Sequence, residues 1–180
     1  MKPVINPVLQ AKFLQHLNTK KKGDEGFTLI ELLVVVIIIG VLAAIALPSL
    51  LGQVNKGKQA EAKQNVGALN RAQQAFFLEG QQFASTVSAL GIGIQTLTNN
   101  FSYAITAVNT GTVYGQQNAT SIKPALKSYY GTVATMTGDA STSEALTVAI
   151  ACESVGPTTT VTPAKLGATT CDTGFVSLSK

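Results

Sequence analysis

Glu31 is the most conspicuous reactive side chain in this sequence, because it lies at the start of a long aliphatic run. From Leu32 to Leu47, sixteen consecutive residues carry no polar side chain. A carboxylate inside an apolar membrane helix costs on the order of 2–3 kcal/mol or more, so it normally has a partner. The run contains no lysine, arginine or histidine that could form an ion pair along the helix. Glu31 therefore either lies at a membrane interface at low cost or finds a partner outside its own helix.

The other reactive side chains do not form a catalytic set. His16 is the only histidine, and we interpret it as a solvated residue near the N-terminus. The acids beyond the apolar run are scattered along the chain and do not have the spacing of a calcium-binding loop. A general base and an activated nucleophile are the minimum for most hydrolytic chemistry. We therefore expect no enzymatic activity, no metal site and no cofactor.

Cys152 and Cys171 are the only two cysteines. An even number of cysteines in an oxidising compartment favours a disulfide. Such a bond would enclose the Pro/Thr-rich loop Glu153–Thr170 and contribute roughly 3 kcal/mol. The alternative is two free thiols, which a mass measurement after reduction and alkylation would distinguish.

The apolar run has the length of a membrane span. Residues 27–51, at about 1.5 Å per residue, cover the ~30 Å hydrocarbon core. Lys20, Lys21 and Lys22 precede the run, which places residues 1–26 in the cytoplasm by the positive-inside rule. The run is apolar on every side, which favours a membrane span over a buried helix in a soluble protein of this size. A secretory signal would have a shorter apolar stretch, although Ala44-Ile45-Ala46 resembles its cleavage site. An uncleaved single-span anchor stays open as a third alternative.

The net charge of +4 comes mostly from the first 26 residues. That segment holds five lysines and two acids, a balance of +3, whereas residues 27–180 hold eight basic and seven acidic residues, a balance of +1. The larger part of the chain therefore has no basic surface that would predict a nucleic-acid site.

The string from Lys22 to Leu32, KGDEGFTLIEL, resembles the prepilin signature of the type IV pilin family. The signature consists of glycine, phenylalanine, Thr-Leu-Ile-Glu and then a long aliphatic run. The resemblance implies that a membrane prepilin peptidase cuts between Gly26 and Phe27 and N-methylates Phe27. It also implies that Glu31 pairs with the Phe27 amine of a neighbouring subunit, which would fix the register of assembly. Gly40 and Pro48 lie where pilins carry a helix-loosening glycine and proline.

The resemblance further implies the function and the partners. The chain would be a structural subunit that polymerises with copies of itself into a type IV pilus, with the help of an assembly platform and ATPase. It would serve motility, adhesion or DNA uptake. The precursor would be a single-pass inner-membrane protein with a cytoplasmic N-terminus, and the assembled form would lie on the cell surface. A minor pilin or a type II secretion pseudopilin is the alternative with the same maturation chemistry.

The pattern of the remaining residues predicts an α+β fold, a long helix packed against an antiparallel sheet. The expected parts are a leader (1–26), a transmembrane and assembly helix (27–51), its amphipathic continuation (52–79), a connecting loop (80–100) and a sheet head (101–180). In the continuation, an apolar face recurs at helical spacing, formed by Ala62, Val66, Leu69, Ala72 and Phe76. The predicted strands are Phe101–Val108, Gly111–Gly115, Tyr129–Thr137, Ala145–Cys152 and Phe175–Leu178.

Overall fold

The computed structural model describes most of the chain beyond the predicted leader. The described residues are 8, 11, 12, 14, 15, 26–110, 113–137, 145–161 and 170–178. The predicted leader therefore lies almost wholly outside the described residues, as does much of the loop between the two cysteines. The structure divides into two units, Met1–Ser49 and Leu50–Lys180, which are described here one at a time.

A single helix, α2 (Leu29–Gly80), accounts for the first half of the described chain and continues through Pro48. It begins two residues after the predicted position, because Thr28 caps its first turn. It ends where Gln81 adopts a left-handed conformation (φ 52°) and donates its backbone N–H to the Phe77 carbonyl at 2.8 Å. In the described part of the chain, α2 is the one helix that is long and apolar enough to cross a membrane.

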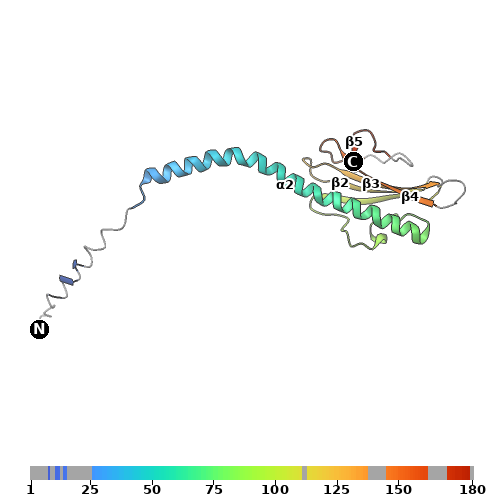
Figure 1. The fold of residues 1–180 in the computed structure, drawn as a ribbon, viewed down its shortest axis with the longest axis horizontal. Helices are drawn as coiled ribbons and strands as arrows, with labels where there is room; N and C mark the ends of the chain where they lie inside the picture. The colour runs from blue at the N-terminus through green and yellow to red at the C-terminus, as the bar shows by residue number, and fades with distance from the viewer. Residues whose placement is uncertain are drawn as a thin grey trace. The chain divides into compact units, whose positions relative to one another are not determined.

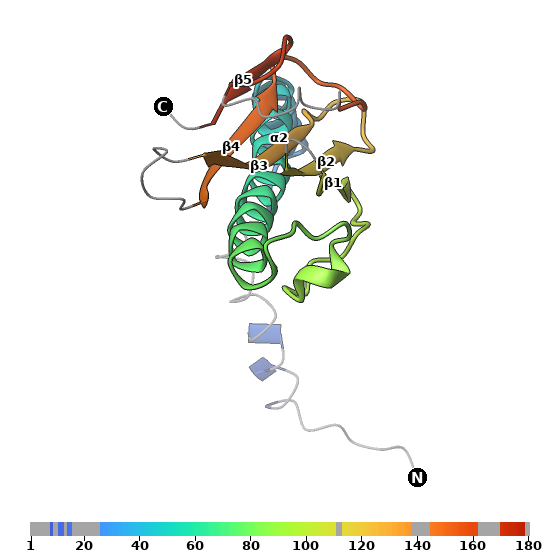
Figure 2. The ribbon, with the colours of Figure 1, turned by 90° about the vertical axis from the view of Figure 1, so that its right-hand side faces the viewer.

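The second unit contains a five-stranded antiparallel sheet in the order β1-β2-β3-β4-β5 (Figure 1). The strands are β1 (Phe101–Val108), β2 (Tyr114–Ser121), β3 (Tyr129–Thr137), β4 (Ala145–Ser154) and β5 (Phe175–Ser177). A short 3-10 helix, η2 (Ser88–Leu90), lies in the segment that connects α2 to the sheet. The C-terminal half of α2 crosses one face of the sheet, with β1 and β5 at opposite edges (Figure 2). The predicted α+β fold is confirmed.

The second strand differs from its prediction. The sequence predicts a strand over Gly111–Gly115, whereas β2 extends from Tyr114 to Ser121. Its centre, Gln116 to Asn118, has low intrinsic strand propensity. Gln116 and Gln117 are nevertheless fully buried, and they pair with Thr132 and Gly131 of β3. Packing between β1 and β3 therefore overrides the local preference of these residues.

The core lies between α2 and the sheet. Ala62, Val66 and Leu69 of α2 are fully buried in a cluster with aromatic side chains of the sheet, namely Phe101, Tyr103 and Tyr129. A second cluster joins Phe77 and Phe83, whose rings stack at 4.8 Å between centroids. Burial of each large side chain contributes about 1.5–3 kcal/mol, so this face holds the helix on the sheet.

Two side-chain amides, one of them fully buried, hold the start of the connecting segment. Gln73 of α2 donates to the Ala84 carbonyl (2.8 Å) and accepts from the Ala84 N–H (2.9 Å). Asn109, just after β1, forms the same two-way contact with the backbone of Phe83, at 2.9 and 3.1 Å. These four hydrogen bonds fix residues 83 and 84 between the helix and the sheet.

Candidate functional site

The start of α2 brings together three of the residues that the sequence singles out. Gly26, Phe27 and Thr28 are exposed and non-helical, directly before the first helical turn. The Thr28 N–H and hydroxyl both donate to Oε2 of Glu31 at 2.8 Å. The Glu31 N–H donates to the Thr28 hydroxyl at 3.3 Å. This reciprocal arrangement is a capping box, which satisfies backbone donors that a helix N-terminus otherwise leaves unpaired.

The capping box gives Glu31 a partner within its own chain, which the sequence reasoning missed. The pattern Thr-x-x-Glu before an apolar run is its signal, and it was present in the sequence. Both hydrogen bonds from Thr28 go to Oε2. Among the described residues, Oε1 accepts no hydrogen bond, so one carboxylate oxygen remains for a donor from another molecule.

The helix that follows exposes nearly all its apolar side chains. The large aliphatic residues from Leu29 to Leu51 are between 44% and 81% exposed, and Phe27 is 79% exposed. A Cβ added at Gly40 would meet no atom within 4 Å, so no close contact within this chain requires glycine there. Such a surface has to be covered by lipid or by other protein chains.

The two cysteines lie in the second unit and form a disulfide, with Cα atoms 5.9 Å apart. Cys152 and Tyr130 are fully buried, and Phe175 packs edge-on against the Tyr130 ring at 4.9 Å. The Asp172 N–H donates to the Tyr130 hydroxyl at 2.9 Å. Burial raises the pKa of Tyr130. The disulfide therefore anchors the C-terminal segment on the sheet face opposite α2.

An ionic cluster links α2 to the sheet on the helix side. Glu153 of β4 contacts Lys63 of α2 at 2.9 Å and Lys127 at 3.3 Å. The Lys63 ammonium also lies 5.8 Å from the centre of the Tyr129 ring. Burial raises the pKa of Glu153, but the hydrogen bonds and charges of the two lysines outweigh it and hold the pKa below its ordinary value. Burial and the nearby Glu153 raise the pKa of Tyr129.

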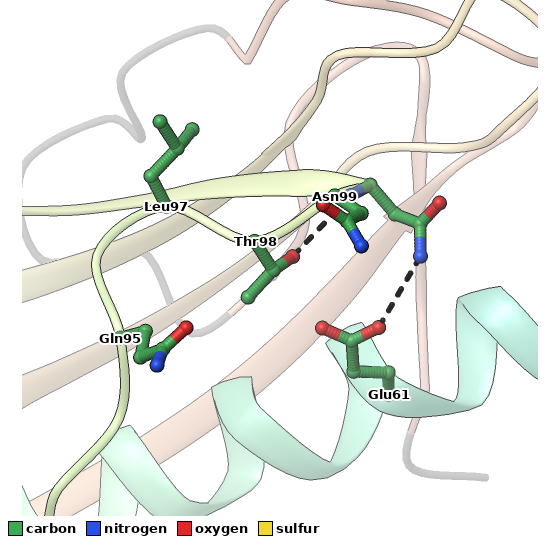
Figure 3. Close-up of a pocket in the computed structure, with 6 residues that line it drawn as sticks. Glu61, Gln95, Leu97, Thr98 and Asn99 are labelled. Carbon is green, nitrogen blue, oxygen red and sulfur yellow. Dashed lines mark hydrogen bonds between the residues drawn. The ribbon is translucent and has the colours of Figure 1, made fainter.

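An open polar pocket of about 430 Å³ lies between α2 and the end of the connecting segment. Figure 3 shows Glu61 pointing from the helix toward the loop that holds Gln95, Leu97, Thr98 and Asn99. The Asn100 amide donates to Glu61 at 3.5 Å, while Thr98 accepts the Asn100 N–H at 3.4 Å. The polar part of the lining consists of side-chain amides, the Thr98 hydroxyl and the Glu61 carboxylate. No group of three or more His, Cys, Asp or Glu residues that could hold a metal occurs in the described part of the chain.

Comparison with known proteins assigns the fold and the N-terminal motif. Residues 59–173 match the family described as "Type IV pilin-like G and H". The chain belongs to this family. Residues 21–47 match the prokaryotic N-terminal methylation motif, which confirms the resemblance seen in the residues around Gly26 and Phe27. No solved structure matches the chain.

Individual relatives include both pilins and pseudopilins. The chain is 42% identical to the type IV major pilin protein PilA of Myxococcus xanthus over 47% of its own length and 38% of that protein. It is 34% identical to the type II secretion system core protein G of Aeromonas hydrophila over 39% of this chain and 50% of the relative. It is 42% identical to a fimbrial protein of Pseudomonas aeruginosa over 37% of this chain and 44% of the relative. The chain thus spans half or less of the length of these relatives.

Proposed function

We propose that this chain is the structural subunit of a type IV pilus. A prepilin peptidase would cut it between Gly26 and Phe27 and methylate the new amine. Copies would then polymerise through α2, driven by an assembly ATPase on an inner-membrane platform. The observation that carries the proposal is the uncovered apolar surface of α2, which begins directly after an exposed Gly26–Phe27 bond. The role is structural rather than enzymatic.

Glu31 would guide assembly by pairing with the Phe27 amine of a neighbouring subunit. A charge inside an apolar bundle is costly when it is alone, and a pair offsets much of that cost. A subunit in the wrong register leaves both charges unpaired, so the pair selects the correct axial position. The capping box supports this role, because it fixes the carboxylate at the start of the helix and leaves Oε1 to accept the amine.

The variant Glu31→Leu tests this role. We expect the variant to enter the membrane and to be cleaved, but to give few filaments in the sheared surface fraction. Because Glu31→Leu also removes the capping box, Thr28→Ala is the matched control: it deletes the hydroxyl but keeps the carboxylate and the residue-28 N–H. Thr28→Ala should assemble nearly normally. Equal loss of filaments in both variants would mean that helix capping, and not pairing between subunits, is the requirement.

A pseudopilin of a type II secretion system is the second candidate, because relatives of that class are among the similar proteins. The anchored disulfide loop and the higher identity to PilA favour the pilus. Quantitative mass spectrometry of sheared filaments distinguishes the two. A major pilin dominates that fraction, whereas deletion of a pseudopilin abolishes protein secretion and leaves surface pili intact.

A further inference from the structure

The helix α2 starts at a defined residue, Thr28, which occupies the N-cap position. Gly26, Phe27 and Thr28 are non-helical, and the Leu32 N–H donates to the Thr28 carbonyl at 3.3 Å as the first helical hydrogen bond. The Thr28 hydroxyl accepts the Glu31 N–H at 3.3 Å and donates to Oε2 of Glu31 at 2.8 Å. The helix therefore begins just after the bond that the proposed peptidase would cut.

The sequence before Thr28 offers a second place at which a helix could start. Asp24 is a favoured N-cap residue, and Glu25 would lie in the first turn of that helix, close to the positive end of its dipole. A helix with this earlier start would include Gly26 and Phe27. Gly26 weakens such a helix but does not forbid it, since glycine is far less disruptive than proline. Two starts therefore compete, and the Thr28 cap favours the later one.

The bond between Gly26 and Phe27 is open on both sides. Gly26 is exposed, and the Phe27 side chain is 79% exposed. A Cβ added at Gly26 would meet no atom within 4 Å, so no contact with the described residues requires glycine there. The accessibility of this bond therefore depends on where the helix begins and not on a cleft formed by the chain itself.

We propose that Thr28 is a positioning residue for cleavage, because its cap holds the Gly26–Phe27 bond outside the helix. This inference rests on the proposed function, since it requires a peptidase that cuts at this bond. Proteases cut exposed irregular segments in preference to regular structure. When opening is fast relative to cutting, the rate of cleavage follows the fraction of chains in which the bond is open. A cap that raises this fraction therefore raises the rate.

Substitutions at position 28 separate the cap from the shape of the side chain. Loss of a typical N-cap changes the equilibrium between the two helix starts about fivefold. Valine resembles threonine in shape and in helix propensity but does not cap, whereas asparagine differs in shape and caps at least as well. Capping therefore predicts that Thr28→Asn is cut faster than Thr28→Val. A peptidase that reads the shape of the side chain would give the opposite order.

The initial rate of cleavage tests the proposal on the full-length precursor. The precursor in detergent is mixed with membranes that contain the prepilin peptidase, and the loss of residues 1–26 is followed on a gel. We expect Thr28→Val to be cut about fivefold, and at least twofold, more slowly than the wild type, and Thr28→Ser and Thr28→Asn at about the wild-type rate. A rate for Thr28→Val within twofold of the wild type, or a Thr28→Asn precursor cut as slowly as Thr28→Val, would overturn the proposal. A cut slowed to this extent still goes to completion during growth, so the yield of filaments stays nearly normal.

Hydrogen exchange of the same precursors locates the start of the helix. A helix capped by Thr28 leaves the N–H groups of Leu29 and Ile30 without a partner in the helix. A helix with the earlier start gives each of these groups a carbonyl four residues back. Both amides should therefore exchange more slowly in Thr28→Val than in the wild type, by about the factor by which cleavage slows. Unchanged exchange beside slower cleavage would mean that the peptidase reads the Thr28 side chain itself, and would also overturn the proposal.

The wild type and Gly26→Val keep this inference separate from the proposed function. If the wild type is not cut after Gly26, or if Gly26→Val is cut as fast as the wild type, the proposed function fails. If the wild type is cut there and Gly26→Val is not, the proposed cut stands, and the Thr28 variants decide the role of the cap alone.

Discussion

The contact between Gly131 and Asn70 provides a sharp test of how the helix is held on the sheet. Gly131 lies in the first half of β3, on the face of the sheet that packs against α2. A Cβ built at this position would lie 2.1 Å from Oδ1 and 2.7 Å from Cγ of Asn70. Asn70 is 6% exposed and donates its amide to the Ile150 carbonyl of β4 at 2.9 Å. The substitution Gly131→Ala must therefore displace Asn70 or move the helix away from the sheet.

The expected loss follows from these two consequences. Displacing Asn70 leaves a buried amide and a carbonyl unpaired, which costs about 1–3 kcal/mol, and overpacking adds about 1–3 kcal/mol. Reduced freedom of the unfolded chain returns about 0.4–1 kcal/mol. We expect Gly131→Ala to lower the free energy of unfolding by about 2–4 kcal/mol, a large part of the 5–15 kcal/mol that is typical of a domain. The transition temperature should fall by roughly 10 °C.

Tyrosine signals give a suitable assay on the full-length chain in detergent. The chain has no tryptophan and four tyrosines, Tyr103, Tyr114, Tyr129 and Tyr130, all in the sheet unit. Thermal unfolding followed by near-ultraviolet circular dichroism therefore reports on this unit and not on the membrane part of α2. Gly156→Ala is the control, because a Cβ there meets no atom within 4 Å, and it should change stability by less than about 0.5 kcal/mol.

A double-mutant cycle identifies the cause. If the clash is with Asn70, Gly131→Ala should cost much less in an Asn70→Ala background, with a coupling free energy above about 1 kcal/mol. A wild-type transition temperature for Gly131→Ala, or additive effects in the double variant, would refute the reasoning.

Three further perturbations follow from the contacts in the sheet unit. Folding lowers the pKa of Glu153, so its ionised carboxylate stabilises the fold above the unfolded pKa, and this stabilisation is lost as the pH falls through the folded pKa. Between neutral pH and about pH 3, the wild type should therefore lose more free energy of unfolding than Glu153→Gln. Equal losses would count against the ionic cluster. Cys171→Ser and chemical reduction should each lower the free energy of unfolding by about 3 kcal/mol, and the two effects should not add together because both remove the same disulfide. An unchanged melting curve after verified reduction would show that this disulfide does not stabilise the fold. Gln73→Ala removes both hydrogen bonds to the Ala84 backbone, so the Ala84 amide should exchange its hydrogen much faster than in the wild type. Protection of this amide at the wild-type level would show that the Gln73 side chain does not hold residue 84 in place.

The sequence predicts the elements whose signals are local and strong. The apolar run and the helical spacing of Ala62, Val66 and Leu69 predict α2 over nearly its whole length, and these three side chains are fully buried as expected. The β-branched and aromatic runs predict β1 and β3 with their observed bounds. In each case a single segment contains the information that decides its structure.

The polar contacts of the core could not be predicted in this way. The predicted helix face continues through Ala72 and Phe76, which are only half-buried, whereas Gln73 points into the core. Gln73 is buried because residue 84 of the connecting segment supplies both of its hydrogen-bond partners, and no helical periodicity shows such a pairing. The β2 strand is a similar case, since its glutamines are paired by strands on both sides.

The candidate site is predicted more completely than the core, because its residues lie within one short segment of the sequence, Gly26 to Glu31. Gly26, Phe27 and Glu31 follow from the motif, and Thr28 completes the capping box that the motif already contains. Their roles in cleavage and assembly depend on other proteins, so no pattern within this chain alone predicts them.

Intact-mass and N-terminal sequence analysis of the chain from sheared filaments and from membranes tests the central proposal most directly. The account predicts that the filament form begins with N-methylated Phe27, followed by Thr28 and Leu29. It also predicts that Gly26→Val leaves a precursor longer by the 26 leader residues, present only in the membrane fraction. A filament subunit that begins at Met1, or a chain that is never cut after Gly26, would contradict the account.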